Sequence, residues 1–180
     1  MRQEVRGSGG RGVRDDVGQP VAVELADGVD REDDQAQQRD GANADLLKAL
    51  YPRVKEEELK EKIIFSLSQN RGDGNAKWLL DVATDAKEPI EMRKKALFWA
   101  GQSRDVSMAD LSAMYARIDD REMKDQIIFV FSQRRGSDAV DKLIEIAKTE
   151  KDKELRKKAI FWLSQSRDPR VVKFMEELIG

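Results

Sequence analysis

The chain has 180 residues, enough for one ordinary domain, and it carries 39% hydrophobic and 38% charged residues at a formal net charge of −2. It contains neither Cys nor His, which excludes disulfides, thiolate and imidazole metal ligands, cysteine nucleophiles and the commonest general base. We therefore expect a protein that is not an enzyme and that uses no cofactor and no metal.

Residues 1–42 differ in composition from the rest of the chain. They hold seven of the twelve glycines but no aromatic residue and no lysine. Such a stretch has too little apolar mass to offset the entropy of ordering, so we predict a disordered leader or an artefactual extension. No run reaches the ~18 apolar residues of a membrane span, and none resembles a signal peptide. The sequence as written predicts a cytoplasmic protein without membrane association; an exported form stays open if the true N-terminus differs.

Residues 43–180 contain an internal repeat. The segment 63–72 returns as 127–136, and the segment 93–105 returns as 156–168. Repeats of this kind are typical of helical arrays. A shorter period, of 31 to 33 residues, is carried by four phenylalanines and four glutamines, namely Phe65, Phe98, Phe129, Phe161, Gln69, Gln102, Gln133 and Gln165.

Each repeat is predicted to contain two helices. The second helix carries the repeated Phe and Gln, and no segment alternates long enough to form a strand. The first helix follows a turn with a residue that can cap it. These residues are Asp73 or Asn75, Ser107, Ser137 and Asp168, the last of which precedes Pro169 in the favoured first turn. The sequence therefore predicts an all-α fold.

The last repeat carries the pattern of a known family. Leu155 and Arg156 open its second helix, Ala159 and Leu163 follow four and eight residues after Leu155, and a Gln-Ser-Arg-Asp-Pro-Arg-Val turn covers 165–171. This pattern resembles the HEAT family, in particular its phycobilisome-lyase-like branch. The resemblance covers roughly residues 43–180. It implies a right-handed α-solenoid of about four HEAT-like helix pairs plus a terminal helix, with the second helices on the concave side and macromolecular docking as the usual role.

The second helices carry the candidate binding surface. At about 100° per residue, a helix that opens at Leu155 gathers Ala159, Trp162 and Leu163 in a buried stripe and turns Phe161 away from it. The same arithmetic turns the other three phenylalanines outward, beside glutamines and lysines. The predicted partner-binding residues are Phe65, Phe98, Phe129, Phe161, Gln69, Gln102, Gln133, Gln165, Lys62, Lys95 and Lys158.

Two interpretations of the phenylalanine row stay open. The rings could anchor a partner helix or an extended peptide, with the glutamines pairing with its backbone groups. They could instead stack on one another and complete a core between repeats. Trp99 and Trp162 lie close to the buried stripe and are predicted for the core.

A row of arginines follows the glutamines. Such cations can meet the last carbonyls of a helix, or they can form a basic edge for a partner that bears carboxylates or phosphates. Glu61 and Asp125 occupy the positions that Lys94 and Lys157 hold in alternate repeats. The charge therefore alternates in sign, which disfavours tracking of a nucleic-acid backbone. The row consists of Arg71, Arg104, Arg135 and Arg167.

These features favour a non-catalytic scaffold that binds a protein or peptide. Its partner and its oligomeric state are not predicted. Two alternatives stay open. One is a nucleic-acid-binding HEAT-like protein, which would need a continuous basic concave face. The other is a lyase or chaperone for a cofactor-bearing protein, by analogy with the phycobilisome branch.

Overall fold

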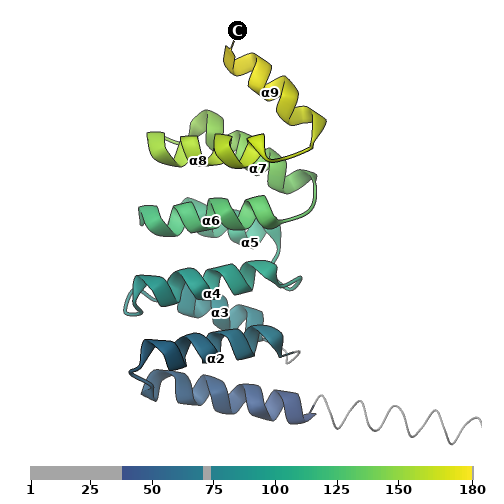
Figure 1. Ribbon diagram of the computed structural model, residues 1–180. Coiled ribbons are helices and arrows are strands. Elements are labelled where there is room, and N and C mark those ends of the chain that lie inside the picture. Colours follow the sequence, from purple (N-terminus) through teal and green to yellow (C-terminus); the bar gives the residue numbers. More distant parts are fainter. Residues whose placement is uncertain (1–37, 71–73, 180) are drawn as a thin grey trace, which may run out of the picture. The chain divides into compact units, whose positions relative to one another are not determined.

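The computed structural model describes residues 38–70 and 74–179 (Figure 1). These residues form helices joined by short turns, and they contain no strand, so the predicted all-α fold is confirmed for this part of the chain. The helices belong to one compact unit. After a helix over residues 38–50, they are η1 (Tyr51–Arg53), α2 (Glu57–Gln69), α3 (Asn75–Thr84), α4 (Ile90–Gln102), α5 (Met108–Arg117), α6 (Arg121–Gln133), α7 (Ser137–Thr149), α8 (Lys153–Ser164) and α9 (Pro169–Ile179).

The helical part begins before the expected boundary at Asn43. The first helix covers residues 38–50. Ala44 in this helix is buried at 1% exposure, and the Asn70 side chain donates to the backbone carbonyl of Asp40 over 2.9 Å. This bond ties the start of the helix to the end of α2. Residues 1–37, on which the rest of the disorder prediction falls, lie outside the described residues.

The helices pack in two layers. The helices that carry the repeated Phe, which are α2, α4, α6 and α8, contact one another in that order. Behind them lie α3, α5 and α7 (Figure 1), and α3 packs on α4 as α7 packs on α8. A helix of 10 to 13 residues is marginal in isolation, so the stacking of apolar stripes provides most of its stability. In α8 this stripe includes Leu155, Ala159 and Leu163, all at most 3% exposed, as expected.

The helix starts only partly follow the predicted caps. Ser107 caps α5 in a capping box, in which its hydroxyl accepts from the Asp110 amide and Asp110 accepts from the Ser107 amide. Asp168 accepts from the Arg170 amide over 2.9 Å. Ser137 and Asn75 are the first residues of their helices rather than caps, because Gly136 and Gly74 precede them with φ of 128° and 76°. Only glycine adopts such angles without strain. Asp73 lies outside the described residues.

Helices α4 and α6 approach each other closely at Gly101. A Cβ atom added there would overlap the Val130 side chain. The equivalent positions in α2, α6 and α8 are Ser68, Ser132 and Ser164. The absence of a side chain in α4 therefore allows Val130 to be completely buried.

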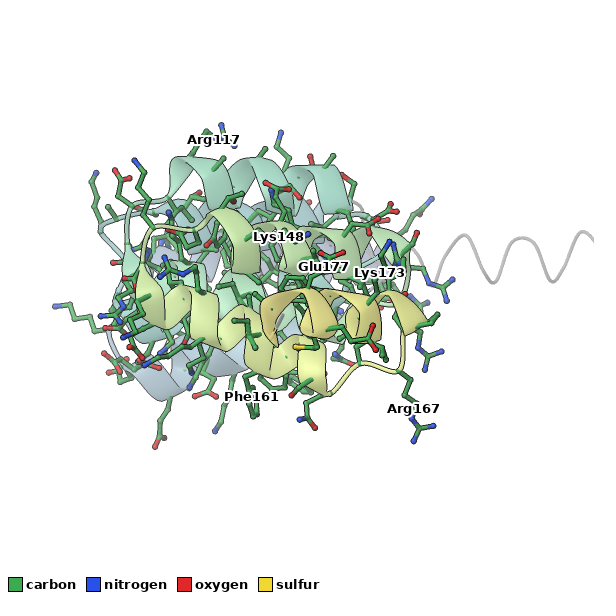
Figure 2. The ribbon with its side chains drawn as sticks, turned by 90° about the horizontal axis from the view of Figure 1, so that it is seen from above. Arg117, Lys148, Phe161, Arg167, Lys173 and Glu177 are labelled. Atoms are coloured by element: carbon green, nitrogen blue, oxygen red, sulfur yellow. The ribbon has the colours of Figure 1, made fainter. Side chains whose placement is uncertain are left out.

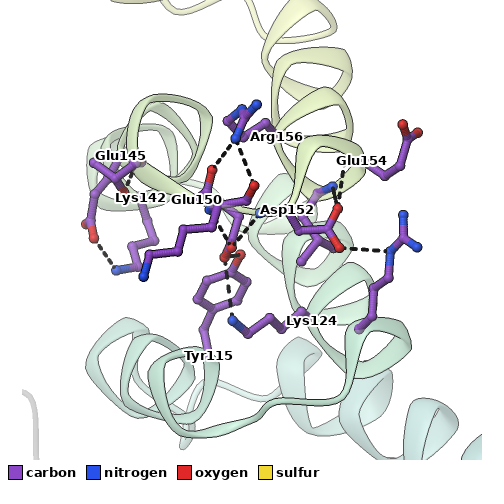
Figure 3. A network of polar contacts seen from close by, with 12 residues as sticks. Tyr115, Lys124, Lys142, Glu145, Glu150, Asp152, Glu154 and Arg156 are labelled. Carbon is purple, nitrogen blue, oxygen red and sulfur yellow. Dashed lines mark hydrogen bonds and ion pairs between the residues drawn. The ribbon is translucent and has the colours of Figure 1, made fainter.

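A Tyr–Lys–Glu cluster connects the third repeat, made of α5 and α6, to the fourth, made of α7 and α8 (Figure 3). The Tyr115 hydroxyl donates to Glu150 Oε2 over 2.6 Å, and Lys124 Nζ lies 3.5 Å from the same oxygen and 5.0 Å from the centre of the Tyr115 ring. Glu150 also accepts from the amides of Lys151 and Asp152. Burial and the Glu150 carboxylate raise the pKa of Tyr115. The hydrogen bond from Tyr115 in turn lowers the pKa of Glu150.

An equivalent Tyr–Lys–Glu cluster connects the first repeat, which ends with α2, to the second, made of α3 and α4. Tyr51 donates to Glu88 Oε2 over 3.1 Å, and Lys60 lies 2.8 Å from that oxygen. Trp78 packs edge-on against Tyr51 at a centroid distance of 5.0 Å. Burial and Glu88 raise the pKa of Tyr51. The described helices therefore contain two similar double repeats, joined where α4 meets α6.

Candidate functional site

The candidate site is the surface of α2, α4, α6 and α8 that carries the four phenylalanines, hereafter the second-helix face. Phe65 is 46% exposed and Phe161 is 54% exposed. Phe98 and Phe129, which lie in the middle of the stack, are half-buried. All four rings therefore point away from the buried stripe, as the helical angles predict, but their exposure depends on their place in the stack.

The rings contact one another from helix to helix. Phe98 and Phe129 stack with centroids 6.0 Å apart and planes inclined by 14°. Phe65 meets Trp99 at 5.2 Å, and Phe129 meets Trp162 at 5.2 Å. The phenylalanines thus pack between helices and also keep part of their surface open to solvent. Together the six rings form the aromatic row: Phe65, Phe98, Trp99, Phe129, Phe161 and Trp162.

The two tryptophans differ from expectation. Trp99 and Trp162 were predicted for the core, but both are only partly buried and pack at its edge. Each indole packs against the phenylalanine of the preceding second helix. Each also contacts the phenylalanine one residue before it in the chain, with ring centroids 4.9 Å apart for Phe98 and Trp99 and 5.0 Å apart for Phe161 and Trp162. A large indole in this position spans the gap between helices instead of filling the layer beneath them.

The glutamines form an exposed row beside the rings, hereafter the amide row, and three of them are held by a serine. Ser132 Oγ donates to the Phe129 carbonyl over 2.6 Å, and Gln133 Nε2 donates to Ser132 Oγ over 3.1 Å. The same relay holds Gln69 through Ser68 and Gln165 through Ser164. Gln102 follows Gly101 and lacks this anchor. These serines were not predicted, although they recur in register with the glutamines.

The lysines of the candidate site are mostly paired across helices. Lys95 forms an ion pair with Glu61, and Lys158 lies 3.3 Å from Asp125. Lys94 completes the series at 3.6 Å from Glu122. The alternation of charge along the repeats thus corresponds to ion pairs between neighbouring helices. These lysines stay near the predicted surface, but their charge is neutralised within the chain.

Lys62 is the exception among the three predicted lysines. It is exposed and has no hydrogen-bond or ion-pair partner among the described residues. With Glu58, Glu61, Phe65 and Trp99 it lines an open hollow of about 490 Å³ between α2 and α4. Part of the Phe65 side chain is therefore accessible from this hollow.

The described arginines of the row lie beyond the C-terminal ends of α4, α6 and α8. Arg104, Arg135 and Arg167 are exposed and form no hydrogen bond or ion pair with the described residues, so they do not bond the last carbonyls. Phe161 and Arg167 project on the side of the stack away from Arg117 of α5 (Figure 2). Arg71 lies outside the described residues.

Arg134, next to Arg135, has a structural role that the repeat pattern did not predict. Its Nη2 donates to the carbonyls of Ser103 and Val106, over 3.0 and 2.6 Å. This side chain therefore fixes the turn after α4 to the end of α6. Its neighbour Arg135 is exposed and forms no hydrogen bond with the described residues.

Among the described residues no helix is long and apolar enough to span a membrane, and no three acidic side chains are grouped to hold a metal ion. Comparisons of the chain with family models, curated proteins and solved structures gave no match.

Proposed function

We propose that the chain is a non-catalytic scaffold, a right-handed α-solenoid of the HEAT type, which binds a protein or peptide on the second-helix face. The observation that carries the proposal is the aromatic row on stacked helices, with Phe65 and Phe161 about half exposed. Grouped apolar side chains on the surface of a soluble protein generally mark an interaction site. In a curved array of this type the second-helix face would be the concave one.

The charges on this face support a polypeptide partner over a nucleic acid. A nucleic-acid backbone is tracked by a continuous run of cations. Here Lys94, Lys95 and Lys158 are each paired with a carboxylate, so the positive charge at this edge is interrupted. Aromatic rings beside fixed amides instead suit the apolar side chains and backbone groups of a peptide.

Capture of partners by the immobilised chain tests the proposal. The double variant Phe65→Ser/Phe161→Ser removes the two most exposed rings of the row. We expect the double variant to bind none of the protein that the unchanged chain captures. Its melting temperature should stay close to that of the unchanged chain, because both rings are about half exposed.

Val172→Ser is the matched control, since Val172 is 62% exposed on α9 and lies outside the second-helix face. It should keep the captured protein. Equal capture by the double variant and the unchanged chain would overturn the proposal.

A further inference from the structure

Three parallel rows cross the second-helix face. The aromatic row runs across the middle of the helices, and the amide row lies one turn nearer their C-terminal ends. The free guanidinium groups of Arg104, Arg135 and Arg167 follow beyond those ends. Helices α4, α6 and α8 thus each present, in the same order, a ring, an amide and a cation. A ligand that lies across the helices would meet this set once per helix.

The spacing of the helices limits the conformation of such a ligand. Packed helices lie about 8–10 Å apart. A polyproline-II segment repeats its face every third residue, over about 9.3 Å, and an α-helix does so every two turns, over about 10.8 Å. A β-strand repeats over about 6.7 Å and falls out of register. The polyproline-II segment and the α-helix both remain compatible with the rings.

The amide row distinguishes these two conformations. In Gln69, Gln133 and Gln165 one N–H donates to the neighbouring serine, which leaves the second N–H and the carbonyl oxygen without a partner among the described residues. An α-helix already satisfies its own backbone groups. A polyproline-II segment has no internal hydrogen bonds, so its backbone carbonyls can accept from these glutamines.

The arginine row determines the charge of the ligand. Arg104, Arg135 and Arg167 are unpaired, and the aspartates close to them are engaged elsewhere. Asp168 pairs with Arg170, Asp105 accepts from Ser103, and Asp138 accepts from Ser137. A guanidinium group binds a carboxylate through two parallel hydrogen bonds. At the opposite edge Lys95 and Lys158 are paired with carboxylates and Lys62 alone of the three predicted lysines is free among the described residues, so carboxylates of a ligand would favour the arginine edge.

We propose that the second-helix face binds an acidic polypeptide segment in the polyproline-II conformation, with an apolar side chain at every third residue on the aromatic row and carboxylates at Arg104, Arg135 and Arg167. This inference rests on the proposed function and names its class of partner.

The test uses the full chain and a fluorescein-labelled peptide of four Leu-Pro-Glu repeats, with binding measured by fluorescence anisotropy. We expect this peptide to bind and a Leu-Pro-Lys peptide of the same length not to bind. Arg104→Gln combined with Arg135→Gln should weaken binding about tenfold or more, since two charge-assisted pairs are lost. The control is Arg117→Gln, on the opposite side of the stack (Figure 2), which should bind as the unchanged chain does.

Two results would overturn the inference. One is the absence of binding by the Leu-Pro-Glu peptide, and the other is binding that the arginine variants do not weaken. An acidic helical peptide with leucine at every seventh residue is measured in parallel. It separates a failure of this inference from a failure of the proposed function. Binding of the helical peptide alone, or capture that depends on Phe65 and Phe161 without binding of the Leu-Pro-Glu peptide, would refute the inference and leave the proposed function standing.

Discussion

At the scale of single residues, the Tyr115–Glu150 hydrogen bond is a clear local determinant of stability. Tyr115 is 7% exposed, and its hydroxyl lies 2.6 Å from the carboxylate. A hydrogen bond to a charged group contributes about 1.5–3 kcal/mol. We expect Tyr115→Phe to lower the free energy of unfolding by about this amount, measured by urea unfolding at neutral pH. Ser112→Ala, on a less buried position of the same helix, should change it little; equal effects would contradict this role.

The pH dependence of stability follows from the raised pKa of the two tyrosines. Both are neutral when folded, and their folded pKa exceeds the unfolded value of about 10. Above that pH the folded state binds more protons than the unfolded state, so stability is fully present below about pH 10 and falls as pH rises further. We expect the double variant Tyr51→Phe/Tyr115→Phe to lose less stability than the unchanged chain between about pH 10 and 12, as measured by urea midpoints. Parallel curves would refute this assignment.

At the scale of elements, the contact between α4 and α6 depends on the missing side chain at Gly101. Alanine in a helix is favoured over glycine by about 0.5–1 kcal/mol, but its Cβ would overlap Val130, and overpacking costs about 1–3 kcal/mol. We therefore expect Gly101→Ala to destabilise the chain, as measured by urea unfolding.

The double-mutant cycle with Val130→Ala supplies the control for this contact. In the Val130→Ala background the overlap is relieved, so Gly101→Ala should become neutral or stabilising. The same loss of stability in both backgrounds would show that Gly101 is required for a reason other than its contact with α6.

At the scale of the whole described unit, the two double repeats predict which internal deletion the stack tolerates. Removing residues 70–133 joins Gln69 of α2 to Arg134, in register with Gln133 of α6. Tyr51 would then face Glu150, and Phe65 would face Trp162, as their counterparts Tyr115 and Phe129 do now. We expect a shorter helical protein that unfolds cooperatively at a lower urea midpoint, because each repeat is stabilised by its neighbours.

Removing only residues 70–102 provides the comparison. That deletion joins α2 to α5 and takes away Glu88, the partner of both Tyr51 and Lys60, together with Trp99, the partner of Phe65. Circular dichroism and urea unfolding should show this chain to be less stable than the one without residues 70–133, although it is longer. The reverse order of stability would contradict the division into double repeats.

The sequence by itself determined the features that depend on one helix at a time. The 3.6-residue period identifies the buried stripe of Leu155, Ala159 and Leu163 and turns Phe161 away from it. The internal repeat likewise predicts two helices in each unit. It also predicts that the phenylalanines and glutamines of the second helices share a register. Those features hold because the periodicity of a single helix determines which side chains lie on one side of it.

Only the tertiary structure decided what stands opposite each side chain. The pairing of Lys95 with Glu61, the bonds of Arg134 to the turn after α4, and the position of Trp99 between two helices all join residues about 30 positions apart. Such contacts depend on the distance and crossing of packed helices, which the period of one helix does not contain. For the same reason the sequence left the phenylalanine row open between stacking and exposure. In the structure Phe98 stacks on Phe129, whereas Phe65 and Phe161 meet tryptophans and stay about half exposed.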